Sequence, residues 1–220
     1  MSDPELVALL QGAKVLLFDF DGPICDVFAG LPAALVARRI ERHLDSKVDS
    51  DDPLRVLEES RQFGEDVVRA VEDDLVMAEL EAVDSAILTP GGIESMIAGL
   101  SAGKVVGVVS NNSSQAVARF FKTSAVLFDF KPLIGRAYAN PGLMKPHPYP
   151  MWQALASAKS DPADAVFIGD SMTDIEVAAK VGVRSVALAN KPGKRELFEK
   201  ADSLVIEDMC DIAHGLAKSG

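Results

Sequence analysis

The stretch "KVLLFDFDGPICD", Lys14 to Asp26, decides how this chain folds. It begins as a run of apolar, strand-forming residues and then places two carboxylates, Asp19 and Asp21, where the strand must end. Aspartate is a poor strand former and two nearby negative charges repel each other, so packing alone gives no reason for the pair. The pair therefore indicates a functional site at the end of a buried strand.

Four later segments resemble this first strand. They lack clean alternation with polar residues, which is typical of strands that are covered on both faces. The clear ones are "KVVGVVS" (104–110), "DAVFIGD" (164–170) and "VRSVALA" (183–189), and "DSLVIED" (202–208) is a weaker one. Helical patterns lie between them, with serines able to cap "SSQAVARFFK" and with Gly182 as a predicted helix end. This alternation predicts an α/β fold with a Rossmann-like, doubly wound parallel sheet.

The stretch 28–88 breaks this rhythm, because it shows helical spacing and no convincing strand. We expect three or four helices here, inserted after the first strand as a cap. The predicted division is a core made of residues 1–27 and 89–220 and a helical cap made of residues 28–88.

Composition narrows the class of protein. The 220 residues are 48% hydrophobic, which is enough for one substantial core and a smaller unit. The net charge is −11 and no basic stripe is interleaved with aromatic residues, so neither nucleic acid nor an anionic membrane is an expected partner. The N-terminal segment fits neither a signal peptide nor a membrane span, so a cytoplasmic protein is expected. The sequence does not indicate an oligomeric state.

Several residues have a structural interpretation. Cys25 and Cys210 lie far apart without the spacing of a metal site, and both are predicted to be buried apolar side chains. Trp152 is expected to pack a helix against the sheet. The segment "LLFDF" recurs as "VLFDF", but Lys131 follows Asp129, so the second copy lacks the paired carboxylate and is assigned to a connection.

Four polar clusters fall at or near the predicted strand ends, where the loops of an open parallel sheet meet and ligands bind. These clusters hold Asp19 and Asp21, Ser110 and Asn111, Lys145, and Asp170 and Asp174. Carboxylates that converge on one crevice are destabilising without a hard cation, and oxygen ligands of this kind suit Mg²⁺. The ammonium group, the serine hydroxyl and the backbone amides near Asn111 add a receptor for a phosphoryl group.

A bound phosphoryl group gives the first two carboxylates different roles. Asp19 can act as a nucleophile and form an aspartyl-phosphate. Asp21 can protonate the leaving oxygen and later deprotonate the attacking water. Gly22 lets the chain turn beside the ligand without a Cβ atom. Mg²⁺ and Lys145 would stabilise the charge on the phosphoryl oxygens.

The segments "FDFDGP", "VVSNN", "MKPHP" and "GDSMTD" occur in the order, and at roughly the spacing, of the four motifs of the haloacid dehalogenase superfamily. The chain from Val15 to Ala201 resembles its phosphoglycolate-phosphatase-like members, and the helical insertion resembles the family's first type of cap. The resemblance implies that small phosphorylated metabolites are the substrates. It also implies the following roles: Asp19 as nucleophile, Asp21 as general acid and base, Ser110, Asn111 and Lys145 on phosphate, and Mg²⁺ held by Asp19, the carbonyl of Asp21 and Asp170. Asp174 would be a metal ligand or a partner of Lys145.

Some questions stay open at this point. Pro23 stands where the family more often has Thr or Val, which predicts altered loop contacts and intact chemistry. Ser110 has a second interpretation as the N-cap of the following helix. Arg38, Arg39, Arg61 and Phe63 are all candidates to contact the leaving group. A phosphomutase or phosphotransferase on the same scaffold is the alternative enzyme, and a non-catalytic phosphate-sensing or protein-binding module is the alternative class.

Overall fold

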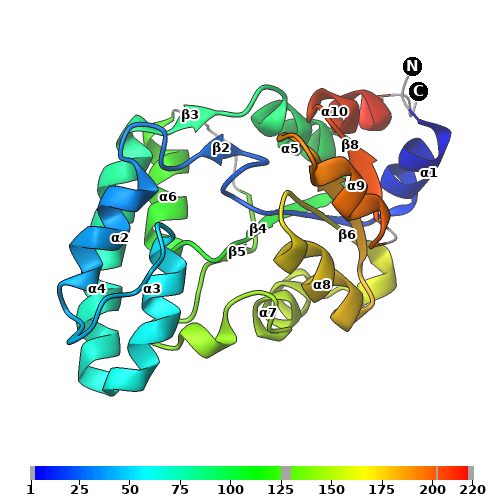
Figure 1. Ribbon diagram of the computed structural model, residues 1–220. Coiled ribbons are helices and arrows are strands. Elements are labelled where there is room, and N and C mark those ends of the chain that lie inside the picture. The colour runs from blue at the N-terminus through cyan, green and yellow to red at the C-terminus, as the bar shows by residue number, and fades with distance from the viewer. Residues whose placement is uncertain (1–2, 125–129, 202, 218–220) are drawn as a thin grey trace.

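The computed structural model describes residues 3–124, 130–201 and 203–217, so the prediction about Asp129 lies outside the described residues. A parallel sheet forms its centre, in the strand order β5-β4-β1-β6-β7-β8 (Figure 1). The strands are β1 (Val15–Phe18), β4 (Val105–Val109), β5 (Leu133–Ile134), β6 (Ala165–Gly169), β7 (Arg184–Leu188) and β8 (Leu204–Ile206). All five predicted strands are present, and β5 is an additional edge strand.

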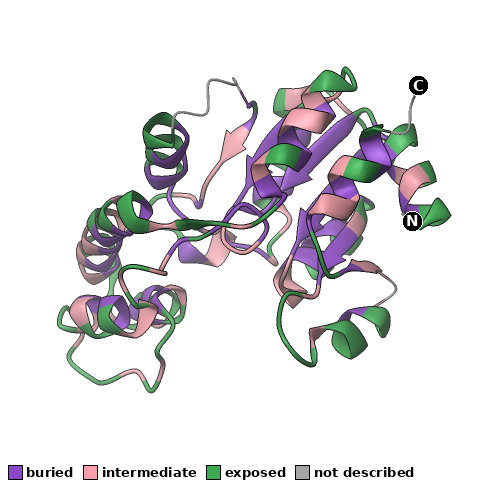
Figure 2. Ribbon diagram, turned by 90° about the horizontal axis from the view of Figure 1, so that it is seen from above, coloured by how far each residue is buried: buried purple, intermediate pink, exposed green. Residues whose placement is uncertain are grey.

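Helices cover both faces of this sheet, and the side chains of β1 alternate between them. Leu16 and Phe18 face a layer that contains α1 (Pro4–Gly12), α5 (Gly92–Ser101), α6 (Ser114–Thr123) and α10 (Cys210–Ala217). Val15 and Leu17 face α7 (Tyr149–Ala158) and α8 (Met172–Val181). Phe198 of α9 (Lys194–Glu199) packs against Ala187 of β7. The central strands are therefore buried on both sides, as Figure 2 shows, and the doubly wound fold is confirmed.

The insertion forms a separate group of helices beside the sheet (Figure 1). It contains α2 (Ala33–Glu41), α3 (Pro53–Glu59), η1 (Ser60–Phe63), α4 (Glu65–Ala82) and η2 (Val83–Ser85). The three α-helices have their own apolar cluster, which includes Val36, Ile40, Leu57 and Leu75. Two further short helices, η3 (Pro141–Leu143) and η4 (Pro162–Asp164), lie in loops of the core. The division of the chain at residues 27/28 and 88/89 stays a prediction.

The two links between the core and the insertion pair with each other. The strand β2 (Cys25–Asp26) runs antiparallel to β3 (Ile87–Leu88). The expectation of no strand in 28–88 was therefore wrong at its last two residues, because so short a strand has no periodicity to detect.

Two predictions about single side chains also need correction. Cys25 is buried as expected, but Cys210 is partly exposed at the start of α10. Trp152 is 49% exposed, whereas its neighbour Met151 is fully buried. Successive residues of a helix point in directions about 100° apart, so only one of this pair can face the sheet. Among the described residues, no helix is long and apolar enough to cross a membrane.

Candidate active site

The central strand β1 leads directly into the site. The backbone N–H of Asp19 donates to Ile168 O at 2.8 Å, so the sheet pairing continues one residue past the strand. The N–H of Phe20 donates to Asp19 Oδ1 at 2.7 Å, which fixes the carboxylate. Gly22 then adopts φ +105°, and a Cβ atom there would lie 2.4 Å from Asp170 Cγ. Both the backbone conformation and the close approach therefore require glycine.

Lys145 reaches this point from the loop before α7, and its side chain is almost fully buried. Its Nζ lies 2.9 Å from Asp19 Oδ1 and 2.6 Å from Asp174 Oδ1. It also donates to Val109 O at 3.1 Å, at the end of β4. The lysine therefore joins the ends of three neighbouring strands, β4, β1 and β6, through direct contacts or through the helix that follows β6.

Asp174 has two tasks at the start of α8. Ser171 is the N-cap of this helix, and the two side chains form a capping box. Asp174 Oδ2 accepts from the backbone N–H groups of Asp170 at 3.1 Å and Ser171 at 3.0 Å. The remaining oxygen faces Lys145. Because both oxygens already have donors, Asp174 is well suited to hold Lys145 in place.

Ser110 does not cap the helix after β4, since Ser113 is the N-cap of α6. The Ser110 hydroxyl instead donates to Asn112 Oδ1 at 3.1 Å and accepts from the backbone of Asn112. Asn111 binds the backbone of Lys145 twice: its Oδ1 accepts from Lys145 N at 2.8 Å and its Nδ2 donates to Lys145 O at 3.1 Å. The side chain of Asn111 therefore ties two predicted phosphate-binding loops together.

All of the predicted site residues except Asp174 line one cavity of about 1030 Å³ between the core and the inserted helices. Asp174 lies behind Lys145 and is 1% exposed. Among the four proposed leaving-group contacts from the insertion, Arg61 alone lines this cavity. Arg39 is instead paired with Asp74 at 2.6 Å. Of the four residues, which the sequence could not rank, Arg61 is therefore the one placed at the cavity.

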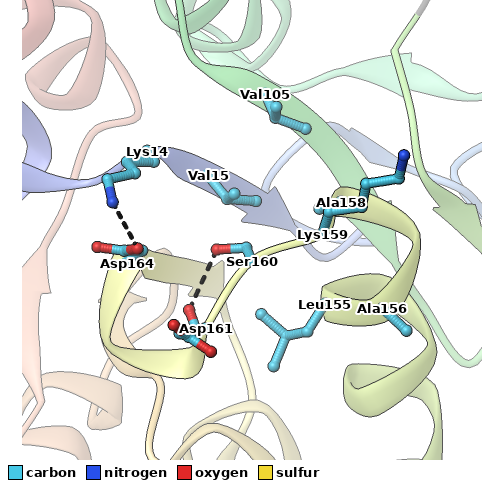
Figure 3. A pocket seen from close by; sticks show the side chains of 10 residues that line it. All are labelled: Lys14, Val15, Val105, Leu155, Ala156, Ala158, Lys159, Ser160, Asp161 and Asp164. Atoms are coloured by element: carbon cyan, nitrogen blue, oxygen red, sulfur yellow. Dashed lines mark hydrogen bonds and ion pairs between the residues drawn. The ribbon is translucent and has the colours of Figure 1, made fainter.

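A second cavity, of about 600 Å³, lies at the opposite ends of the strands, where β1 and β4 begin (Figure 3). Its charged residues include Lys14 and Asp164, which pair with each other at 2.8 Å. Among the described residues, the one cluster of acidic side chains close enough to share a cation lies elsewhere, at Asp19, Asp170 and Asp174. The chemistry of the protein is therefore expected at the carboxyl ends of the strands.

Burial controls the protonation of the site. It raises the pKa of Asp19 to about 7 and the pKa of Asp21 to about 6. Burial alone would lower the pKa of Lys145, but the carboxylates of Asp174 and Asp19 outweigh it and raise that pKa. Lys145 therefore stays charged, while the pKa of Asp21 lies in a range that would suit a general acid and base.

The charge balance of the site fits a divalent cation. Oxygen atoms of Asp19, Asp170 and Asp174 lie within 4.8 Å of one another. The ionised site holds four carboxylates and two ammonium groups, which leaves two negative charges. These groups are Asp19, Asp21, Asp170, Asp174, Lys145 and Lys194. Hard carboxylate oxygens are the ligands that Mg²⁺ prefers, so the residues present suit this ion.

Sequence reasoning missed a buried network that connects the insertion to the Ser110 loop. Arg136 pairs with Glu72 at 2.8 Å and with Glu79, and the three side chains are at most 1% exposed. Glu79 also accepts from the backbone N–H of Ser113 at 3.0 Å and from Asn112 Nδ2 at 3.2 Å. A signal existed, because the two glutamates lie seven residues apart on the buried face of α4.

Lys194 was also missed. Its ammonium group lies 2.7 Å from Asp170 Oδ2. It stands in a polar segment, "NKPGKRE", where a loop leads into α9, and the segment offers no pattern to distinguish one lysine from the next. The contact depends on how the loop after β7 folds back toward β6, which a single sequence does not reveal.

Comparisons with known proteins agree with this geometry. A family model described as haloacid dehalogenase-like hydrolase matches residues 16–188. Phosphoglycolate phosphatase 1 of Pseudomonas aeruginosa is 26% identical over 236 residues, which covers 96% of this chain and 83% of that protein. A predicted phosphatase from Clostridium acetobutylicum superposes with a TM-score of 0.73 at 16% identity, covering 94% of this chain and 99% of the other. A β-phosphoglucomutase from Clostridium difficile gives 0.69 at 18% identity, covering 94% and 98%. The two structures support the fold alone.

Proposed function

The chain belongs to the haloacid dehalogenase-like hydrolase family, as an enzyme of its phosphatase type, and from this premise we propose that it is a Mg²⁺-dependent phosphatase of small phosphomonoesters. The observation that carries the proposal is the contact of 2.9 Å between Lys145 Nζ and Asp19 Oδ1 in a cavity that further carboxylates line. The similarity to a phosphoglycolate phosphatase along 96% of the chain supports the same reaction class.

In the first step the carboxylate of Asp19 attacks phosphorus, and the bond between phosphorus and the leaving oxygen breaks. Asp21 gives its proton to that oxygen, so the product leaves as a neutral alcohol. In the second step water attacks the aspartyl-phosphate and Asp21 takes back a proton, which releases phosphate and restores Asp19. The hydrogen bond of 3.0 Å from Val27 N to Asp21 Oδ1 supports a fixed position for this proton carrier.

Mg²⁺ would be held by the carboxylates of Asp19 and Asp170 and by the backbone carbonyl of Asp21. When bound, it supplies positive charge to the phosphoryl oxygens. Lys145 supplies a second positive charge beside Asp19, and Asp174 keeps that ammonium group in place. We assign phosphate binding to the hydroxyl of Ser110 and to the backbone of Asn111, whose side chain is already bonded to Lys145.

The substrate is a small phosphorylated metabolite whose leaving group extends toward the insertion. The cavity includes Arg61 on that side, and its guanidinium is suited to a polar or anionic leaving group. The free thiols of Cys25 and Cys210 are compatible with the reducing cytoplasm, which we propose as the location of the enzyme.

The test is a phosphate-release screen of the purified full chain over phosphoglycolate, sugar phosphates and nucleotides. The proposed enzyme releases phosphate with Mg²⁺ and stops when EDTA removes the ion, and Asp19→Asn is inactive under both conditions. Full activity of Asp19→Asn would show that Asp19 is not the nucleophile. An isomerised sugar phosphate without free phosphate would instead identify a phosphomutase, and binding without turnover would identify a sensor.

A further inference from the structure

Lys194 makes an unusually complete set of contacts with Asp170. Its ammonium group lies 2.7 Å from Asp170 Oδ2 and also donates to the backbone carbonyl of the same residue. A third bond of 3.0 Å reaches Asn190 Oδ1, and Asn190 Nδ2 donates back to Asp170 Oδ2 at 3.2 Å. The side chains of Lys194 and Asp170 are 22% and 14% exposed, so solvent screens their ion pair only in part.

An active-site lysine commonly contacts either the nucleophile or the substrate, and the position of Lys194 fits neither role. Lys145 already occupies the place beside Asp19. Lys194 does not line the large cavity where substrate is expected. It lines an adjoining cavity of about 400 Å³, which shares Asp21 and Asp170 with the large one. The direct contact of Lys194 with the candidate site is therefore its ion pair with Asp170.

We propose that Lys194 is a built-in counter-ion of Asp170 that weakens the binding of the divalent cation. This inference rests on the proposed function, in which Asp170 is a metal ligand. In the metal-free protein the ammonium group offsets the repulsion between Asp170 and the nearby carboxylates of Asp19 and Asp174. The same charge repels a divalent ion that binds beside it, because two positive charges share one carboxylate.

The sign of the effect distinguishes this idea from a supporting role in which Lys194 simply shapes the site. Neutralising Lys194 leaves Asp170 more negative, so the cation gains attraction. A purely structural lysine would have the opposite effect, since a disordered Asp170 would bind the cation less well. Lys194→Arg keeps the positive charge and hence its repulsion of the metal ion, so this variant is a control that should behave like the wild type.

The experiment measures Mg²⁺ binding by calorimetry and Mn²⁺ binding by electron paramagnetic resonance on the full chain without substrate. We expect Lys194→Met to lower both dissociation constants at least about tenfold. Lys194→Arg should remain within about threefold of the wild type. Lys191→Met is the matched control, because Lys191 lines the same cavity without a hydrogen bond or ion pair to Asp170 among the described residues, and it should also stay within about threefold.

Lys194→Gln is the second neutral variant, and it carries the test if Lys194→Met does not fold. Unchanged or weaker metal binding in the folded neutral variant would overturn the inference. Wild-type protein that binds neither ion would instead contradict the proposed function. A third result is also decisive: the wild type binds the metal ion, Asp170→Asn binds it much more weakly, and Lys194→Met has the same dissociation constant as the wild type. This result would leave the proposed function intact and would rule out only the counter-ion role of Lys194.

Discussion

Arg61 lines the same cavity as the proposed catalytic residues. Its guanidinium packs against Gly142, where an added Cβ would lie 3.4 Å from its carbon, and it makes no ion pair with the described residues. Arg61→Ala should therefore raise KM about tenfold or more, the cost of one hydrogen bond to a charged group, with a smaller change in kcat. Arg38→Ala is the control, because Arg38 makes only an exposed contact of 3.7 Å with Asp51. Equal effects of the two changes in steady-state kinetics would remove Arg61 from the binding site.

Asp21 is expected to matter in both chemical steps. Asp21→Asn should lower kcat about 10²- to 10⁴-fold, the usual contribution of general acid–base catalysis. An aryl phosphate with a good leaving group needs no proton in the first step, so this variant should release one burst of the phenol per enzyme molecule and then stall. Rapid-mixing absorbance measures the burst, and Asp19→Asn should give none. A steady rate without a burst would assign the proton transfer to another group.

Three of the site residues that the sequence predicted share a physical property. Asp19, Ser110 and Asp170 each follow a strand at its carboxyl end, so a local pattern fixes their place in the sheet. Lys194 lies 24 positions from its partner Asp170, at the start of α9, and its place depends on how the preceding loop packs. Residues of this second kind need tertiary structure, because no local pattern brings them together.

At the level of elements, the helix α4 couples the insertion to the core through buried charged side chains. Its Glu72 and Glu79 hold Arg136 in a fully buried network. Arg136→Met leaves two buried carboxylates without their cation, so we expect a loss of about 3 to 5 kcal/mol in the free energy of unfolding. Burial already raises the pKa of Glu72, because the buried position disfavours its ionised form.

The control for this prediction lies on the same helix. Arg69 pairs with Glu65 at 2.9 Å and with Asp66 at 2.8 Å, but these groups are exposed. Arg69→Met should therefore cost no more than about 1 kcal/mol. Urea denaturation followed by circular dichroism compares the two variants, and similar losses would show that the buried network is not the main contact between α4 and the core.

Elements also show where sequence reasoning ends. Strands of four or five residues, such as β1 and β6, were predictable because an unbroken apolar run exceeds chance. The strands β2, β3 and β5 have two residues each, and pairing with a neighbour rather than composition defines them. The helices of the insertion were predictable from their spacing, but the antiparallel pair that joins them to the core was not.

For the molecule as a whole, the insertion packs directly against two loops of the candidate site. The loop that carries Lys145 also sends Met144 into the apolar cluster of the inserted helices. Glu79 of the same helices holds the loop that carries Ser110. A change in the position of the insertion is thus expected to affect phosphate binding, because both of the proposed phosphate-binding loops contact the insertion directly.

The buried carboxylates make global stability depend on pH and metal together. Their folded-state pKa values, about 7 for Asp19 and about 6 for Asp21, exceed the reference value of 3.8. The folded protein therefore binds more protons than the unfolded chain between about pH 4 and pH 7, so its stability falls as pH rises through this window. In EDTA, the melting temperature should drop from pH 5 to pH 8. The free energy of unfolding should fall by an amount on the order of a few kcal/mol over the same range.

Mg²⁺ should reverse this loss, because it binds the ionised carboxylates of the folded state only, and its stabilising effect grows with concentration over the dissociation constant. The rise in melting temperature on adding Mg²⁺ should therefore be larger at pH 8 than at pH 5. Asp19→Asn is the matched control: without this titrating group its melting temperature in EDTA should fall less steeply with pH, and Mg²⁺ should stabilise it less. If the melting temperatures of wild type and variant changed equally with pH and with Mg²⁺ across this window, the charge at Asp19 would not be what the cation neutralises.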